Sequence, residues 1–398
     1  MTDGEKVLLS YKKFLSIFVN DYSLFQILPI TMPRFLSLLL ILAISASSVF
    51  AIKTDELIWH SADSLPLYGS MAPTAKKAYS RLPDSLESRV RPELWALGLN
   101  SAGLAIRFRS DASALGFKWK SLNKFNMNHM TPTGIRGMDL YVLDNGKWDT
   151  VTSVRPSLNN HKTTTMAITD MTPEMREYML YLPLYDGIDS IYIGVDSAAV
   201  LLSPAVDLPS RQKPIVMYGT SILQGGCATR AGMIHTSMLG RMFNREVINL
   251  GFSGNGQLDK EIAMLIAQSD PSVVVLDMLP NCTKEQIEER LVPFYEIIRK
   301  ALPDVPILMV ESPIFPIMKW NTETNATITE KNLTLARIFN ELAASDKNLY
   351  YYEGSKVLND REGTVDNYHL TDLGFKEFAN NMYPVLLPLV NQTDNAHN

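Results

Sequence analysis

The sequence predicts two folds in one chain: an antiparallel β-sandwich domain over residues 52–210, then a three-layer, doubly wound α/β domain over residues 211–398. In the first range apolar residues alternate with small or charged ones, which is typical of strands with one buried face. In the second range short continuous apolar runs alternate with longer helical stretches, which is typical of buried parallel strands and their crossover helices. A chain of 398 residues is long enough for both domains and a processed N-terminal segment.

The segment before the first domain contains a compact apolar run at residues 35–44. This run is too short to span a bilayer comfortably. Met32 and Arg34 precede it and small residues follow it, as in a secretion signal that signal peptidase removes. We therefore expect a signal peptide at residues 32–51, with residues 1–31 upstream of the true start. The mature protein would then be periplasmic or extracellular, without a stable membrane span; a retained membrane anchor is the alternative.

The sandwich prediction rests on three stretches in which apolar and polar residues alternate, at residues 104–109, 115–120 and 191–196. Asn145-Gly146 and Asp186-Gly187 supply turn residues of the kind that join hairpin strands. An antiparallel sandwich is the economical interpretation.

The α/β prediction rests on five short apolar runs, at residues 214–218, 247–250, 272–277, 306–311 and 349–352. Helices should fill the intervals, for example at residues 284–301, and one should close the chain after Thr371. The proline-rich segment 203–213 is the expected linker between the two domains.

Composition excludes two classes of protein. A hydrophobic content of 46% with 20% charged residues excludes a mainly disordered chain. The formal net charge of −5 leaves no surplus of positive charge for a phosphate backbone, so we expect no nucleic-acid partner.

Candidate catalytic residues should lie at the strand exits, because ligand sites of open parallel sheets form at the carboxyl ends of the strands. The first exit reads Gly219-Thr220-Ser221, where glycine allows a sharp turn and the serine can be exposed. A serine in this position is either a nucleophile or a cap of the following helix.

Two more exits offer groups that could bind an anion. Residues 251–256 are rich in glycine and precede a helix, so their N–H groups either cradle an anion or form a tight turn with positive φ. The glycines follow the order G-x-x-G-x-G, which argues against a dinucleotide site. Asn281, at the third exit, either donates to a developing oxyanion or caps the helix that begins near Lys284.

Asp366 and His369 lie about one helical turn apart near the C-terminus. The carboxylate can therefore hold one ring nitrogen while the other faces the serine, as a general base for an unactivated hydroxyl. His235, on the helix after the serine, should be packed or capping. The other histidines have no comparable setting: His60, His129, His161 and His397.

The order of these pieces resembles the Ser, Gly, Asn and His blocks of SGNH/GDSL hydrolases over nearly all of residues 211–398. The matching residues are Gly219-Thr220-Ser221, Gly254, Asn281 and Asp366-Asn367-Tyr368-His369. The resemblance implies a flavodoxin-like sheet and a carboxylic ester hydrolase that uses neither a metal nor a cofactor. By the same resemblance Ser221 is the nucleophile, His369 is the general base and Asp366 orients it. The oxyanion hole would consist of the N–H groups of Ser221 and Gly254 and the side chain of Asn281.

Gly137-Met138-Asp139-Leu140-Tyr141 resembles the GxDLY signature of a sandwich domain that precedes such hydrolases in secreted bacterial proteins. Asp139 and Tyr141 are either structural or part of a sugar-binding surface. Two matches in the expected order support each other.

The chain departs from the family blocks at three acidic positions, which hold Thr220, Asn255 and Cys282. The nucleophile, the oxyanion donors and the base are all present, so the departures bear on the substrate and on the hydrogen bonding around the serine. By family analogy we expect short acyl esters, chiefly acetyl, on carbohydrate or on another small ester. The alternatives are a lipid-directed esterase or lipase and a non-catalytic carbohydrate-binding protein.

Two cysteines, Cys227 and Cys282, are too few for a disulfide scaffold and are not spaced as zinc ligands. In an oxidising compartment they could pair near the active site, and two free thiols are the alternative.

Overall fold

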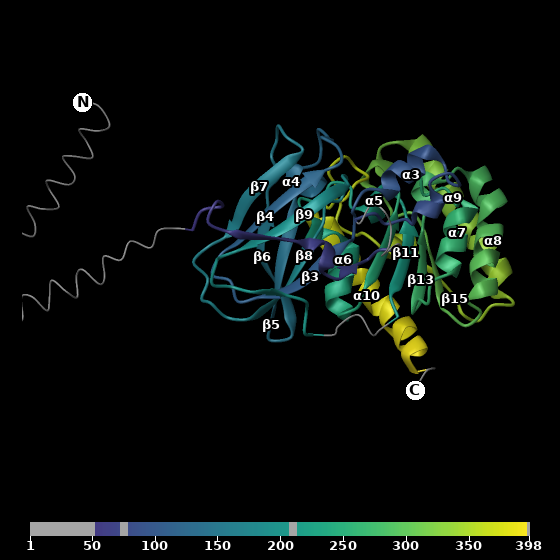
Figure 1. Cartoon of the computed structure of the whole chain (residues 1–398). Coiled ribbons are helices and arrows are strands. Elements are labelled where there is room, and N and C mark those ends of the chain that lie inside the picture. Colours follow the sequence, from purple (N-terminus) through teal and green to yellow (C-terminus); the bar gives the residue numbers. More distant parts are fainter. Residues whose placement is uncertain (1–51, 72–78, 207–212, 396–398) are drawn as a thin grey trace, which may run out of the picture. The chain divides into compact units, whose positions relative to one another are not determined.

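The computed structural model describes residues 52–71, 79–206 and 213–395 (Figure 1). The expected signal peptide, the residues before it, and the expected domain boundary between residues 210 and 211 lie outside the described residues. From Ile52 onward the chain forms one compact unit. Within the described residues no helix is both long enough and apolar enough to cross a membrane.

Two antiparallel sheets form the N-terminal sandwich. One sheet has the strand order β1 (Ile58–Ser61), β9 (Ile188–Val195), β4 (Leu115–Ser121) and β7 (Lys162–Ile168). The other has the order β10 (Leu201–Leu202), β3 (Ala105–Ser110), β8 (Arg176–Tyr181), β5 (Met138–Asp144) and β6 (Lys147–Val154), with β2 (Leu67–Tyr68) paired to β3. Alternating apolar side chains such as Phe108, Phe117 and Ile193 fill the space between the sheets.

One of the two predicted hairpin turns is present. Asn145 and Gly146 join β5 to β6, and both have the positive φ that a tight two-residue turn needs, 47° and 78°. The prediction for Asp186-Gly187 is wrong, because β8 and β9 belong to different sheets. The Asp186 side chain instead accepts hydrogen bonds from the N–H groups of Asn123 and Gly187 at 2.9 and 2.8 Å, which fixes the crossing between the sheets.

The C-terminal part contains the predicted parallel sheet. Its strand order is β12 (Val247–Gly251), β11 (Ile215–Gly219), β13 (Val273–Asp277), β14 (Ile307–Val310) and β15 (Leu349–Tyr352). All neighbouring strands are parallel, which gives the flavodoxin-like order of a doubly wound domain. The predicted strands are confirmed to within two residues at each end.

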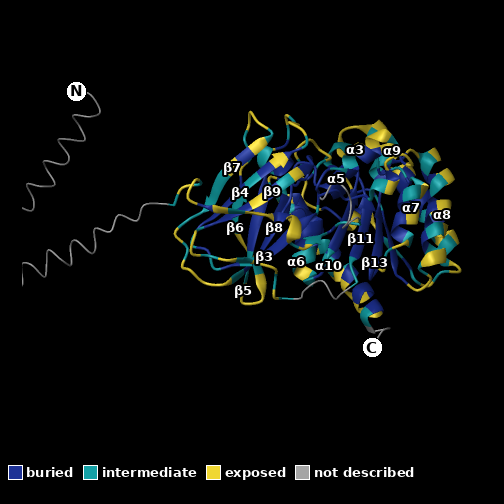
Figure 2. Ribbon diagram, in the orientation of Figure 1, coloured by how far each residue is buried: buried dark blue, intermediate teal, exposed yellow. Residues whose placement is uncertain are grey.

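Helices cover both faces of this sheet (Figure 1). Met217 and Val275 face α6 (His235–Phe243) and α10 (Asp372–Asn395), whereas Val216 and Val274 face the opposite helices. The opposite helices are α7 (Lys260–Ala267), α8 (Lys284–Ala301) and α9 (Thr322–Ala343). The central strands are therefore buried along their length, while the outer faces of the helices are exposed (Figure 2).

A segment near the N-terminus is built into the core of the parallel sheet. It includes α3 (Pro92–Gly98), and Leu82 and Leu94 pack in the cluster formed by α7, α8 and the sheet. The guanidinium of Arg81 is fully buried and donates to the carbonyl oxygens of Asn249 and Gly251 at 3.1 and 2.7 Å. These contacts tie the segment between β2 and β3 to the carboxyl end of β12, beside the candidate site.

Candidate active site

Ser221 lies at the carboxyl end of the central strand β11, as the first residue of the short helix α5 (Ser221–Gln224). The cap of this helix is Thr220, whose hydroxyl accepts a hydrogen bond from the Ile222 N–H group at 3.3 Å. The alternative interpretation of Ser221 as a helix cap is therefore wrong. The turn is tight, because a Cβ atom on Gly251 would lie 2.2 Å from the backbone nitrogen of Gln224.

The structure brings Ser221, His369 and Asp366 together in one hydrogen-bonded chain. Ser221 Oγ lies 2.8 Å from His369 Nε2, and His369 Nδ1 lies 2.8 Å from Asp366 Oδ2. The other Asp366 oxygen accepts hydrogen bonds from the backbone N–H groups of Tyr368 and His369 at 3.1 and 2.8 Å. This is the arrangement in which an imidazole can remove the proton of a serine hydroxyl.

The Asp366 carboxylate is held in its charged form. Partial burial alone would raise its pKa, but the hydrogen bonds from the His369 side chain and from the two backbone N–H groups outweigh burial and lower the pKa below its usual value. A negative carboxylate fixes the Nδ1–H tautomer of His369, which leaves Nε2 as the basic nitrogen toward Ser221.

The two other residues expected in the oxyanion hole follow the strands on either side of β11. Gly254, after β12, has a φ of +68° with open space around it, so the turn presents its backbone. Asn281 ends a 3-10 turn (Leu279–Asn281) after β13, and its side-chain oxygen accepts a hydrogen bond from Gly256 N–H at 3.3 Å. This bond leaves the Asn281 NH₂ group as the donor available to a ligand.

Asn281 is not a helix cap. The cap of α8 is Thr283, which forms a reciprocal capping box with Gln286. The sequence Thr283-x-x-Gln286 is the signal that could have settled this alternative before the structure.

Two residues of the site come from segments that carried no functional signal in the sequence. Arg91, just before α3, donates to Asn255, which follows Gly254, and forms a bidentate ion pair with Asp259 at 2.8 and 2.9 Å. His129, in the connection after β4, places Nε2 3.9 Å from Asp366 Oδ2. Arg91 therefore supports the glycine loop, and His129 faces the carboxylate of Asp366.

Cys227 and Cys282 are both free, buried thiols, so the alternative of two free thiols holds in this structure. Cys227 lies beside the two histidines of the site. The possible ligand atoms of His129, Cys227 and His369 lie within 4.8 Å of one another, and among the described residues this is the group able to hold a metal ion.

Asp139 and Tyr141 of the GxDLY segment are buried and structural. Asp139 is 0% exposed and accepts hydrogen bonds from Arg230 Nη1 at 2.6 Å and Gly232 N–H at 2.9 Å. Arg230 also donates to the Tyr141 hydroxyl at 2.9 Å. Because Asp139 is fully buried, a sugar could not reach it. The GxDLY segment instead joins the sandwich to Arg230 and Gly232, which follow α5.

Two clefts lie beside the hydrogen-bonded chain. The larger, which we call the α3 cleft, encloses about 660 Å³ between Leu97 of α3, the loop of residues 123–127, and Ser253 and Asn255. Its floor includes Tyr185, whose hydroxyl donates to the Ser221 carbonyl oxygen at 3.3 Å. The smaller cleft encloses about 290 Å³ and is lined by residues that adjoin the site, such as Pro280 and Tyr368, and by Phe315 and Ile328.

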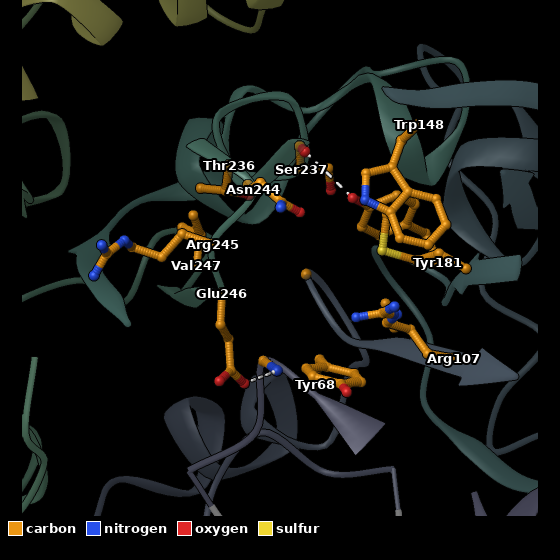
Figure 3. Close-up of a pocket in the computed structure, with 15 residues that line it drawn as sticks. Tyr68, Arg107, Trp148, Tyr181, Thr236, Ser237, Asn244, Arg245, Glu246 and Val247 are labelled. Carbon is orange, nitrogen blue, oxygen red and sulfur yellow. Dashed lines mark hydrogen bonds between the residues drawn. The ribbon is translucent and has the colours of Figure 1, made fainter. Parts of the chain in front are cut away.

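A further cavity of about 50 Å³ lies between the sandwich and α6, and it holds none of the predicted site residues (Figure 3). Arg107 points into it from β3 with its guanidinium 5.5 Å from the ring of Tyr68 and 5.1 Å from the ring of Trp148. Glu246 lies across from it and accepts a hydrogen bond from Gly69 N–H at 2.5 Å. Its small size indicates a structural junction.

Both parts of the chain match known protein families. Residues 212–387 match the GDSL-like lipase/acylhydrolase family, and residues 57–201 match the GxDLY domain, the N-terminus of SGNH-hydrolase-type esterases. The structure resembles a putative GDSL-like lipase from Bacteroides ovatus ATCC 8483, with 31% identity, 84% of this chain and 98% of that chain covered, and a TM-score of 0.80.

Two more distant structures share the fold. The salicylyl-acyltransferase SsfX3 from a tetracycline biosynthetic pathway is 16% identical with a TM-score of 0.69, and a family two carbohydrate esterase from Cellvibrio japonicus is 12% identical with a TM-score of 0.55. Both comparisons cover 84% of this chain and 98% of the other. No curated protein matches the chain.

Proposed function

The chain belongs to the GDSL-like lipase/acylhydrolase family, and from this premise we propose that it hydrolyses short acyl esters, chiefly acetyl esters of carbohydrates, with Ser221 as the nucleophile. The observation that carries the proposal is the hydrogen-bonded chain from Ser221 through His369 to Asp366, with 2.8 Å at each step. An undisturbed chain of this kind argues against a non-catalytic protein.

In the proposed reaction His369 Nε2 takes the proton of Ser221 as Oγ attacks the ester carbonyl carbon. The oxyanion accepts hydrogen bonds from the N–H groups of Ser221 and Gly254 and from the Asn281 side chain. His369 then gives the proton to the leaving alcohol, and an acyl-serine remains. Water, deprotonated by the same imidazole, attacks the acyl carbon and restores the free serine.

The α3 cleft supports a sugar as the alcohol part of the substrate. It adjoins Gly254 through Ser253 and Asn255, so a group bound there lies next to the proposed oxyanion hole. Its walls combine neutral amides such as Asn100 and Asn123 with the ring of Phe125, which is 47% exposed. Amides hydrogen-bond to hydroxyl groups while an exposed ring packs on the C–H face of a sugar.

A long acyl chain has less support. A lipid-directed esterase needs an extended apolar channel beside the nucleophile, whereas the α3 cleft also carries the charged residues Glu93 and Lys124. The smaller cleft contains Lys331 and Glu323 beside its apolar residues. A short acyl group such as acetyl needs neither cleft to be long or apolar.

We also propose that the protein is exported to the periplasm or beyond the cell. The support is the apolar run at residues 35–44 with small residues after it. An acetylated polysaccharide would be met in that compartment.

The test is acetate release from a panel of acetylated polysaccharides, with 4-nitrophenyl acetate as a small reference ester. The wild type should release acetate from at least one polysaccharide, and Ser221→Ala should release none. Activity on the small ester with no release from any polysaccharide would overturn the carbohydrate assignment. Equal release by Ser221→Ala would overturn the serine mechanism.

A pair of variants tests the role of the α3 cleft. Phe125→Ala should raise KM for an acetylated oligosaccharide about fivefold, because aromatic packing contributes about 1 kcal/mol, and should leave the small ester unchanged. The matched control is Tyr192→Ala, which removes a ring that is 42% exposed on β9 of the same sandwich. Equal KM values for the wild type and both variants would exclude the cleft as the sugar site.

A further inference from the structure

Three side chains with metal-binding atoms converge beside Ser221 from separate segments. His129 comes from the sandwich, in the connection after β4, and Cys227 follows the turn after α5. His369 is the proposed general base. Their ligand atoms lie within 4.8 Å of one another.

The ligand set suits zinc. Thiolate and imidazole groups are the ligands that zinc prefers, and water can complete a tetrahedron around three protein ligands. Asp366 Oδ2, which lies 2.8 Å from His369 Nδ1 and 3.9 Å from His129 Nε2, stands outside the group of three, so water would be the fourth ligand.

Only a small closure would be needed to bind the ion. Bond lengths of about 2.0 Å to nitrogen and about 2.3 Å to sulfur put ligand atoms within about 4 Å of each other around a tetrahedral ion. The side chains of His129 and His369 are 33% and 27% exposed, so both rings have room to turn toward a common centre.

Cys227 is held in an unusual way for a buried cysteine. Its φ is +76°, a left-handed conformation that costs free energy for any residue with a Cβ atom. Its thiol has no hydrogen-bond partner among the described residues, whereas the Cys282 thiol donates to the Gly256 carbonyl oxygen at 3.5 Å. A thiol that has no hydrogen-bond partner among the described residues, on a strained backbone and close to two imidazoles, is suited to bind a metal ion.

We propose that His129, Cys227 and His369 form a site for a zinc-like divalent cation, and that occupancy stops catalysis by taking His369 away from Ser221. The second half of this statement rests on the proposed function; the first half does not. At neutral pH an ordinary cysteine thiol carries its proton before a metal arrives. Binding forms the metal–sulfur bond and releases that proton to solvent.

The site itself is tested with Co²⁺ as a spectroscopic probe on the reduced protein. The wild type should bind one equivalent and show the near-ultraviolet charge-transfer absorption of a thiolate–cobalt bond. Cys227→Ser should lose this absorption, and the matched control Cys282→Ser should keep it. Absorption that survives in Cys227→Ser, or none in the wild type, would overturn the site whatever the esterase activity is.

Inhibition is tested with Zn²⁺ and 4-nitrophenyl acetate, each variant being compared with its own metal-free rate. Cys227→Ser and His129→Ala should raise the Zn²⁺ concentration for half-inhibition at least tenfold. The controls Cys282→Ser and His60→Ala, the latter an exposed histidine of β1, should respond as the wild type does. An unchanged response in Cys227→Ser and His129→Ala would overturn the inhibitory role.

Discussion

Arg91 donates hydrogen bonds to both oxygens of Asn255, at 2.6 Å to the side chain and 3.0 Å to the backbone carbonyl. Asn255 stands where the family block has an acidic residue, directly after Gly254. The charge that would be at residue 255 is supplied four positions later by Asp259, which pairs with the same guanidinium. The glycine loop is therefore positioned by a residue that precedes the sandwich strands β3–β10.

Arg91→Ala should impair catalysis without removing any group that touches the ester. Asn255, next to Gly254, would lose two hydrogen bonds and Asp259 would lose two more, and a displacement of about 1 Å can cost up to a hundredfold in rate. We expect kcat for 4-nitrophenyl acetate to fall at least about tenfold. Arg89→Ala, which changes an exposed arginine of the same segment, should keep the wild-type kcat. Equal kcat values for the two variants would refute this positioning role.

Asp139→Ala should destabilise the fold by about 3 kcal/mol, because it leaves Arg230 and the Gly232 N–H group without their buried acceptor. Urea unfolding measures the change. Asp149→Ala, at an exposed position on the neighbouring strand β6, should alter the free energy of unfolding by less than about 0.5 kcal/mol. A similarly small change for Asp139→Ala would show that the contacts of Asp139 with Arg230 and Gly232 contribute little to the free energy of unfolding.

His235 should make the protein sensitive to acid. Its ring is buried and stacked on Phe378 at 4.4 Å, and burial lowers its pKa to about 3. The unfolded chain, with a histidine pKa of about 6.5, then binds more protons than the native state at intermediate pH, so stability is lost as pH falls below about 6.5. At pH 5 this loss is about 2 kcal/mol.

His235→Phe removes the titrating group and keeps an aromatic ring between the same neighbours. Between pH 8 and pH 5 the free energy of unfolding should fall about 2 kcal/mol less in this variant than in the wild type. Taking the difference between two pH values cancels any change in packing. The same pH dependence in both proteins would contradict the assignment of a neutral, buried His235.

The fold was largely predictable because its signals are local. A buried parallel strand needs a continuous apolar run, and α8 begins and ends at the predicted residues 284 and 301. The error at Asp186-Gly187 has a physical reason. Turn residues show where the chain bends, but whether the next strand pairs in the same sheet depends on packing between distant segments.

The residues of the candidate site that belong to the family's sequence blocks could be predicted. The residues outside those blocks could not. Ser221, Asp366 and His369 are far apart in sequence, and the structure brings them within hydrogen-bond distance. Arg91 and His129 had no local pattern to mark them. Both reach the site through contacts between the sandwich segments and the α/β domain, which a single sequence does not reveal.

The central claim is that Ser221 is the nucleophile of an esterase, and the most direct test is kcat/KM for 4-nitrophenyl acetate in Ser221→Ala. His369→Ala should be equally inactive, whereas Asn281→Ala should keep a measurable remnant because loss of one oxyanion donor costs about 3 kcal/mol. For folded Ser221→Ala protein we predict a fall in kcat/KM of roughly four orders of magnitude or more. Hydrolysis by Ser221→Ala at the wild-type rate would contradict the mechanism.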